Sequence, residues 1–322
     1  MIKKSTASKD FIWAYLIHLG YNMWADSEVS EWCDHVPELT EHISAKPYLR
    51  FSEKLWDKLL LQMVKAGINM IVIDLGEGVR YDSHPEISVE NSWSTTHLKE
   101  ELSKIRNLGL EPIPKLNFST CHDAWLGTYS RCVSTPSYYQ VCSDLIAEVA
   151  ELFNTPRFFH LGYDEESAAL QKSFDYVVIR QFDLWWHDFL FFVDEVEKQG
   201  VRPWIWSDYI WNHPKEFMDK MPKSVLQSNW YYGTTFKEDE IAVQAYTELA
   251  KHGYDQIPAA SNFFDPESLN FKKTVEFCEK HIPSPQLMGF IQTPWVPTLD
   301  VFSERHSQAI KLVETTIQNL RP

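Results

Sequence analysis

The chain repeats one local pattern four times: an amphipathic stretch ends in glycine, and an apolar run follows at once. In the first copy, residues 52–66 place Leu55 and Leu59 on one helical face, Gly67 follows, and residues 68–74 are mostly apolar. Glycine is expected after a helix because the left-handed backbone conformation of that position costs glycine little. The other copies end at Gly109, Gly200 and Gly253. The pattern predicts alternating helices and strands joined by short connections.

Eight apolar runs of strand length occur along the chain, each followed by a stretch with helical pattern. They span residues 11–17, 68–75, 110–117, 157–163, 201–207, 224–230, 256–261 and 287–293. Eight such units in 322 residues predict an α/β fold of the (β/α)8 TIM barrel type. We expect residues 1–322 to form a single domain, with a long first βα loop at about 18–49. The rival is an open doubly wound sheet, but no glycine-rich phosphate loop follows any strand.

The composition excludes several kinds of partner. The net charge is −15, and no run of Lys and Arg is long enough to follow a phosphate backbone, so we expect no nucleic-acid and no membrane partner. The 13 Trp and 14 Tyr exceed what a core usually requires. Their flat apolar faces suit sugar rings, so a small-molecule carbohydrate is the expected partner. The sequence does not predict an oligomeric state.

The five cysteines are odd in number and lack CxxC spacing, so they indicate neither a disulfide framework nor a zinc site. No His-x-His or His-Glu-x-x-His spacing occurs, and we expect no metal and no cofactor. The apolar run at 11–19 follows three lysines, but it contains His18 and lacks a small-residue cleavage site. We interpret it as a strand. These features predict a cytoplasmic protein, unless an export signal has been removed from the sequence.

One predicted strand ends in three consecutive carboxylates, Asp164, Glu165 and Glu166. Adjacent acids repel one another, so such a cluster is tolerated where it faces a polar cleft and one member holds a proton. A glycosidase needs a protonated carboxyl beside an ionised one, because one group donates a proton and the other stabilises positive charge. The alternative is an acidic helix N-terminus, where these side chains complement the helix dipole.

Active sites of TIM barrels lie at the C-terminal ends of the strands. At these ends the sequence places acids, amides, histidines and aromatic rings, which favours a sugar site over a generic set of loop residues. The candidate substrate-binding residues are His18, Trp24, Asp74, Glu77, Asn117, His122, Trp206, Asp208, Trp230, Tyr232, Asn262, Gln292 and Trp295. We expect the rings of Trp206, Trp230 and Trp295 to surround Asp164 and Glu165 as a deep cup, which the 18–49 loop closes from one side.

In the order of its motifs the chain resembles family 20 glycoside hydrolases, the β-N-acetylhexosaminidases. The family's His-x-Gly-Gly-Asp-Glu after strand four is similar to residues 160–165, and its Ile-Pro-Glu-Ile-Asp of strand three is similar to residues 113–117, which also run to a His. After strand two, the family's Gly-Trp-Arg and Pro-Glu-Leu are similar to residues 78–80, which end in Arg80, and 85–87. Its Trp-x-Asp of strand five and the Trp of strands six and eight are similar to residues 206–208, Trp230 and Trp295.

The resemblance implies a retaining hydrolysis in which the substrate assists. Glu165 would protonate the glycosidic oxygen, and the 2-acetamido oxygen of the substrate would attack C1. Asp164 would orient the acetamide and stabilise the resulting oxazolinium ion, while Trp230 and Trp295 would flank the sugar. The implied substrate is a terminal 2-acetamido hexoside, and a closed cup favours exo-action over cleavage within a polymer.

The chain departs from the family at several positions. Tyr163 replaces the second Gly of the strand-four motif, which would narrow the space beside the acids. Lys115 and Asn117 replace the two acids of strand three. In the family a Tyr near the position of Phe263 and Phe264 binds the acetamide, but these two residues have no hydroxyl to do so. Tyr231 or Tyr232 would have to take this role. The family's sugar-binding Arg follows strand one directly, whereas Arg50 comes after the long loop.

Two other functions stay open. One is a two-carboxylate glycosidase that acts on plain hexosides, with Glu165 paired to Glu77 or Asp208 across the barrel. The other is a carbohydrate-binding barrel without catalysis, which the substitutions in strand three would permit.

Of four further polar residues, two have both a functional and a structural interpretation, and the other two have a structural interpretation. Lys115 is expected either to bind a substrate hydroxyl or to pair with a barrel carboxylate. His122 either pairs with Asp123 or is a structural hydrogen-bonding residue. His160 is expected to be a buried core residue, and Glu166 to cap the next helix.

Overall fold

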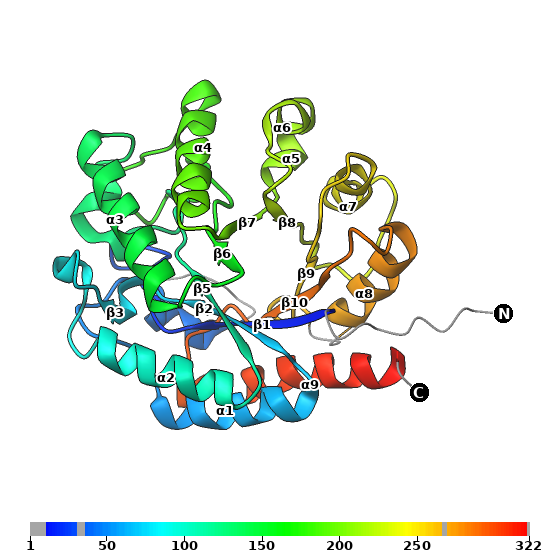
Figure 1. The fold of residues 1–322 in the computed structure, drawn as a ribbon, viewed down its shortest axis with the longest axis horizontal. Helices are drawn as coiled ribbons and strands as arrows, with labels where there is room; N and C mark the ends of the chain where they lie inside the picture. Colours follow the sequence, from blue (N-terminus) through cyan, green and yellow to red (C-terminus); the bar gives the residue numbers. More distant parts are fainter. Residues whose placement is uncertain (1–10, 31–35, 266–268, 321–322) are drawn as a thin grey trace.

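The eight apolar runs form eight parallel strands that curve into a barrel, as predicted (Figure 1). The computed structural model describes residues 11–30, 36–265 and 269–320. The strands hydrogen-bond in the order β8-β7-β6-β5-β2-β1-β10-β9. Their bounds are β1 (Ile12–His18), β2 (Met70–Asp74), β5 (Glu111–Lys115), β6 (Phe158–His160), β7 (Arg202–Trp206), β8 (Leu226–Ser228), β9 (Ala259–Ser261) and β10 (Gly289–Thr293).

The two ends of this strand order meet and close the barrel. Parallel bridges join Gln227 of β8 to Gln256, and Trp230 to Ala259 of β9. The Ile257 amide also donates to the Gln227 carbonyl at 2.9 Å. Because the barrel is closed, the C-terminal ends of all eight strands surround one opening. A separate parallel pair, β3 (Val79–Arg80) and β4 (Trp93–Ser94), lies between β2 and α2.

Helices alternate with the strands and cover the outside of the barrel (Figure 1). Their bounds are α1 (Glu53–Ala66), α2 (Thr95–Asn107), α3 (Pro136–Leu152), α4 (Phe182–Lys198), α5 (Tyr209–Asn212), α6 (Pro214–Lys220), α7 (Ile241–Lys251), α8 (Asn270–His281) and α9 (Ser303–Leu320). Ser52 accepts a hydrogen bond from the Leu55 amide where α1 begins, and Gly67 ends α1 with a φ of 83°. Gly109, Gly200 and Gly253 also have φ above 70°, so the glycine pattern marked the helix ends correctly. No described helix is long and apolar enough to cross a membrane.

Side chains alternate along each strand between the barrel interior and the helix layer. In β1, Ile12, Ala14 and Leu16 belong to the interior cluster, whereas Trp13 and Tyr15 face the helices. Toward the C-terminal ends the buried positions become polar or charged: His18, Asp74, Lys115 and His160. The fold therefore changes from an apolar interior to titratable groups at the end where TIM barrels bind substrates.

The long β1–α1 loop packs over one side of this opening. Its Tyr21, Met23 and Leu39, the last within the short helix η1 (Pro37–His42), form an apolar cluster with Phe263 and Val296 from the loops after β9 and β10. Glu31, Trp32 and Cys33 of the loop lie outside the described residues. Four cysteines lie within the described ranges, and all have free thiols: Cys121, Cys132, Cys142 and Cys278.

Candidate active site

A cavity of about 230 Å³ opens at the C-terminal ends of the strands. It is smaller than the roughly 300–1,000 Å³ typical of ligand pockets, so it suits a single sugar ring or a group of similar size. The two candidate acids and five of the candidate binding residues lie in its lining. The complete lining is Trp24, Leu39, Cys121, His122, Asp164, Glu165, Leu170, Trp230, Tyr232, Phe263, Phe264 and Trp295.

His122, Asp164 and Glu165 form one charged group in this cavity, here called the pocket cluster. The His122 Nε2 atom lies 3.4 Å from Asp164 Oδ2 and 3.3 Å from Glu165 Oε2. Burial alone would lower the pKa of His122, but the two carboxylates outweigh burial and raise that pKa to about 10. The imidazole is therefore protonated near neutral pH. His122 faces these acids, and no hydrogen bond to the buried Asp123 carboxylate occurs among the described residues.

Asp164 is held in its ionised form. Burial alone would raise its pKa, but the charge of the adjacent His122 imidazolium, the charge of Lys115 and a hydrogen bond from Asn117 lower it to about 2. Asn117 Nδ2 donates to Asp164 Oδ1 at 2.9 Å. Asp164 is nearly buried, whereas 32% of the Glu165 side chain is exposed. The two adjacent acids therefore lie in different environments, which is what a division of roles between them requires.

The turn that carries the acids has an unusual backbone. Gly162, Tyr163 and Glu165 take φ angles of 68°, 73° and 58°. A residue other than glycine keeps such an angle where the surrounding contacts impose it. Here Asn117 Oδ1 accepts a hydrogen bond from the Tyr163 amide at 3.1 Å, and Asp208 Oδ2 accepts one from the Glu165 amide at 2.8 Å.

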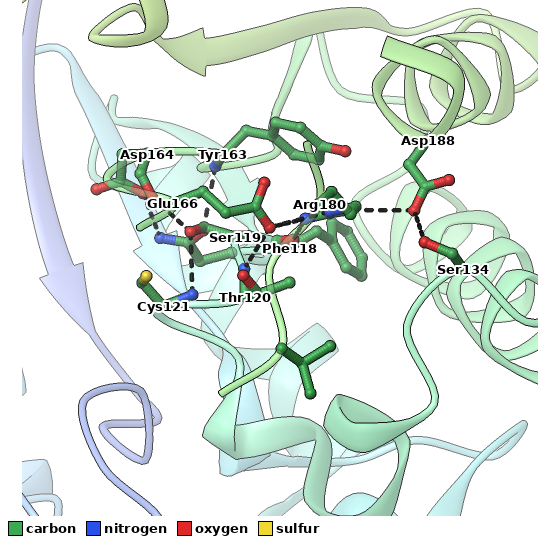
Figure 2. Close-up of polar contacts among 12 residues, drawn as sticks. Phe118, Ser119, Thr120, Cys121, Ser134, Tyr163, Asp164, Glu166, Arg180 and Asp188 are labelled. Carbon is green, nitrogen blue, oxygen red and sulfur yellow. Dashed lines mark hydrogen bonds and ion pairs between the residues drawn. The ribbon is translucent and has the colours of Figure 1, made fainter. Parts of the chain in front are cut away.

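The side chains of Tyr163 and Glu166 lie away from the cavity. Figure 2 shows Asp164 and the Tyr163 ring on opposite sides of the turn. The ring packs against Trp185 of α4 at 5.0 Å, so it does not narrow the space beside the acids as expected. Glu166 Oε1 accepts hydrogen bonds from Nε and Nη2 of Arg180 at 2.9 and 2.8 Å. The interpretation of Glu166 as a helix cap is therefore wrong, because this side chain forms a buried ion pair.

A second charged group, here called the sealed cluster, consists of His18, Asp74 and Lys115 at the ends of β1, β2 and β5. Lys115 Nζ donates to Asp74 Oδ2, which also lies 3.3 Å from His18 Nδ1. No side chain of the three is more than 6% exposed. Burial lowers the pKa of His18, so its imidazole is neutral at pH 7. The ion-pair interpretation of Lys115 is confirmed. The three residues of the sealed cluster lie beneath the cavity and are not part of its lining.

Aromatic rings form much of the cavity wall. Trp24 meets the His122 ring edge-on at 4.9 Å, and Trp230 stacks on Tyr232 at 5.0 Å. Trp295 Nε1 donates to the Tyr232 hydroxyl at 3.0 Å, which fixes the two rings relative to each other. The described part of the cavity thus offers flat apolar faces beside the pocket cluster.

Trp206 lies in the barrel interior and is not part of the wall. Its ring lies 4.3 Å from the ring of His160 and 5.7 Å from that of Trp295. His160 is buried and accepts a hydrogen bond from the Gly162 amide at 3.0 Å, as expected for a core histidine. Trp295 also lies 5.9 Å from the His18 ring, so it separates the cavity from the sealed cluster.

Arg50 and Glu77 anchor the β1–α1 loop instead of lining the cavity. Glu77 Oε1 accepts hydrogen bonds from the amides of Tyr21 and Asn22 at 2.8 and 3.0 Å. Arg50 Nη2 donates to the Asn22 side-chain oxygen at 2.5 Å. Both side chains are consumed by buried contacts with this loop.

Four more candidates lie outside the cavity lining. Gln292 faces the helix layer, because it lies on the same side of β10 as Phe290. Asn262 donates to the Arg305 carbonyl at 3.1 Å, and Arg80 is exposed on β3. Asp208 supports the Glu165 amide from behind; burial and the charge of Asp164 raise its pKa well above the usual range.

Five lining residues were not among the candidates. Phe263 and Phe264 lie in the loop after β9, and Cys121 lies beside His122 in the loop after β5, so their positions in these loops were a usable signal. Leu39 and Leu170 lie inside long loops, where no sequence period indicates which side chain turns inward.

The pocket cluster is also the one group of three described His, Cys, Asp or Glu residues that could hold a metal ion, with ligand atoms within 4.8 Å of one another. A metal would need the imidazole in its neutral form. Since the carboxylates raise the pKa of His122 to about 10, a proton already occupies the place of the cation. The donor set therefore fits a protonated histidine better than a metal.

Comparisons with known proteins agree with this architecture. No protein-family model matches the chain. A β-N-acetylhexosaminidase from Bacteroides fragilis has a TM-score of 0.61 and 13% identity, over 94% of this chain and 65% of that chain. A family 20 exo β-N-acetylglucosaminidase from Vibrio harveyi, solved with N-acetylglucosamine, has a TM-score of 0.60 and 12% identity, over 94% and 54%. The chain resembles family 20 glycoside hydrolases in its fold.

One curated protein is also similar in sequence. The lacto-N-biosidase of Bifidobacterium bifidum is 22% identical over 219 residues, which cover 59% of this chain and 19% of that protein. The chain thus spans about a fifth of this relative and about half to two thirds of the solved structures. At such low identity the resemblance is that of a divergent relative, and it extends to the fold.

Proposed function

We propose that this barrel is a glycoside hydrolase that acts on a terminal 2-acetamido hexoside. The observation that carries the proposal is the adjacent pair Asp164–Glu165, which faces one imidazole in an aromatic-lined cavity at the end of β6. The similar proteins are hexosaminidases and a lacto-N-biosidase, which supports the same substrate class.

In the proposed reaction the protonated form of Glu165, the more exposed acid, donates its proton to the glycosidic oxygen as the bond from C1 to that oxygen breaks. The acetamido oxygen of the substrate forms a bond to C1 at the same time, which gives an oxazolinium ion. Asp164 is ionised and fixed by Asn117, so it can orient the acetamide and stabilise the positive charge. Water then attacks C1 as the bond from C1 to the acetamido oxygen breaks, which restores the acetamido group, and the Glu165 carboxylate accepts the proton of the water.

The size of the cavity supports action on one terminal sugar. Its volume of about 230 Å³ leaves little room beyond a single ring. The cavity offers that ring the apolar faces of Trp230, Tyr232 and Trp295. Because Tyr232 lines the cavity, its hydroxyl could take the acetamide-binding role. We therefore propose exo-action.

The contacts of Glu77 and Asp208 disfavour either residue as the second carboxylate of a two-carboxylate mechanism. Glu77 is occupied by backbone amides of the β1–α1 loop, and Asp208 lies behind the Glu165 amide; neither lines the cavity. A nucleophile must reach C1 of a bound sugar from within the cavity. Besides Glu165, Asp164 is the one carboxylate in the described lining of the cavity.

A panel of chromogenic glycosides with and without the 2-acetamido group tests the proposal. Hydrolysis confined to acetamido sugars is the expected result. Hydrolysis of plain hexosides would instead support the two-carboxylate mechanism, and binding without hydrolysis would support a carbohydrate-binding barrel.

A further inference from the structure

Arg180 is a buried cation that joins three parts of the chain beside the pocket cluster (Figure 2). Its side chain is 1% exposed and pairs with Glu166, two residues beyond Asp164. Nη2 also donates to the Phe118 carbonyl in the loop after β5 at 2.7 Å, and Nη1 lies 3.5 Å from Asp188 Oδ2 of α4. One guanidinium therefore contacts the β5 loop, the β6 loop and a helix.

The partners of Arg180 are themselves fixed. Glu166 Oε1 accepts a hydrogen bond from the Thr120 amide at 3.2 Å, a second link between the two loops. Asp188 accepts hydrogen bonds from the hydroxyls of Ser134 and Tyr139. A planar guanidinium held by several acceptors has one orientation, unlike a lysine ammonium.

The two loops joined in this way carry the pocket cluster. His122 comes from the β5 loop, whereas Asp164 and Glu165 come from the β6 loop. The spacing between the imidazole and the acids is therefore the spacing between the loops. The acid turn also contains left-handed φ angles at Tyr163 and Glu165, which external contacts must maintain.

We propose that Glu166 and Arg180 act as a positioning pair that sets the placement of the two acids relative to His122. Neither residue lines the cavity, so neither is expected to touch a substrate. The guanidinium also lies 4.5 Å from the centre of the Tyr163 ring, so the pair holds the turn from both of its ends. The predicted effect on turnover rests on the function proposed above, whereas the predicted effect on the turn does not.

The test uses three variants of the full chain. Glu166→Gln removes one charge with little change in size, Arg180→Lys keeps the charge but loses the fork geometry, and Glu166→Gln with Arg180→Met removes both charges. Leu249→Ala, in the buried face of α7, is the control for lost stability without a change near the acids. Each protein is measured for kcat, KM, melting temperature and amide hydrogen exchange of residues 158–170.

For the double variant we expect kcat to fall by about tenfold to a hundredfold with KM changed by less than about threefold, since small misplacement of reacting groups lowers turnover strongly. Arg180→Lys should have a higher kcat than the double variant. Amide exchange in the turn that carries the acids should increase in the double variant. The control Leu249→Ala should keep the kcat of the wild type even if its melting temperature falls as far as that of the double variant.

The proposal is overturned if the double variant keeps the kcat of the control, or if exchange in the acid turn does not change. Should the double variant fail to fold, the milder Glu166→Gln variant is judged by the same two measurements. If the wild-type chain hydrolyses no glycoside, the proposed function fails, but the exchange measurement still decides whether the pair holds the turn.

Discussion

The pocket cluster and the sealed cluster combine acids and basic groups at the same end of the barrel, but they differ in charge balance and exposure. In the sealed cluster one carboxylate, Asp74, faces one ammonium, and no side chain is more than 6% exposed. In the pocket cluster two carboxylates share one imidazole, and 32% of the Glu165 side chain is exposed. A matched buried pair has no charge left for a ligand, whereas an unmatched group beside a cavity does. Position at a strand end therefore does not by itself identify a binding residue.

The comparison predicts that substitution of Glu165, the exposed member of the pocket cluster, lowers turnover far more than it lowers stability. In Glu165→Gln we expect kcat to fall by ~10²–10⁴-fold, because a positioned general acid contributes that much. Steady-state kinetics on an acetamido glycoside and the unfolding midpoint measure the two effects. Glu238→Gln, at an exposed surface position, is the control and should change neither. Full activity of Glu165→Gln would transfer the acid role to another residue.

In the sealed cluster we expect the reverse. Asp74→Asn leaves Lys115 buried without its carboxylate, so the free energy of unfolding should fall by ~3–5 kcal/mol. Asp74→Asn with Lys115→Met removes both charges and should recover most of this loss. Denaturant unfolding of the single and double variants provides the measurement. If Asp74→Asn were as stable as the wild type but inactive, the distinction between the two clusters would be lost.

The histidines of the two clusters should also respond to pH in opposite directions. The pKa of His122 is raised from an unfolded value near 6.5 to about 10, so its contribution to stability is complete below about pH 6.5 and is lost as pH rises through 10. For Asp164, lowered to about 2, the contribution is complete above about pH 4 and is lost as pH falls through 2. The pKa of His18 is lowered, so its protonation opposes folding in acid.

Denaturant unfolding at about pH 5, 7 and 9 measures these contributions. We expect the wild type to lose on the order of a few kcal/mol between the first and last of these, and His122→Gln to lose less. His18→Gln is the control, and it should keep the alkaline loss of the wild type. An equal loss in His122→Gln would mean that the imidazole is not paired with the acids.

The barrel could be predicted from the sequence because its signals are local and repeated. A glycine such as Gly67 ends a helix through its own backbone conformation, and apolar runs such as 68–75 form strands whatever lies on either side. Asp164 and His122 were also found locally, since each lies in the loop that follows a strand. For these features, the position of a residue in the sequence is enough to place it at the active-site end of the barrel.

The rest of the site depends on which way a side chain points. Gln292 follows a strand pattern but faces the helices, because alternation assigns it to the outer side of β10. Tyr163 turns away from the cavity through a left-handed φ that its residue type does not suggest. Glu77 and Arg50 are bound by the β1–α1 loop, a contact between distant segments. Apart from that of Gln292, these orientations are set by tertiary contacts that one sequence does not contain.

The smallest predicted effect concerns Trp295, the ring that separates the two clusters. Trp295→Ala should weaken binding of an acetamido monosaccharide by about three- to tenfold, because a sugar loses one aromatic face worth roughly 1 kcal/mol. It should also admit water to His18, whose lowered pKa should then rise toward its ordinary value. Calorimetry measures the first effect, and an imidazole NMR titration measures the second. Trp295→Phe should retain much of both, and Trp56→Phe, which replaces a buried ring of α1 far from the cavity, should alter neither. Weaker binding with an unchanged His18 would mean that Trp295 contacts the sugar but does not seal the cluster beneath it.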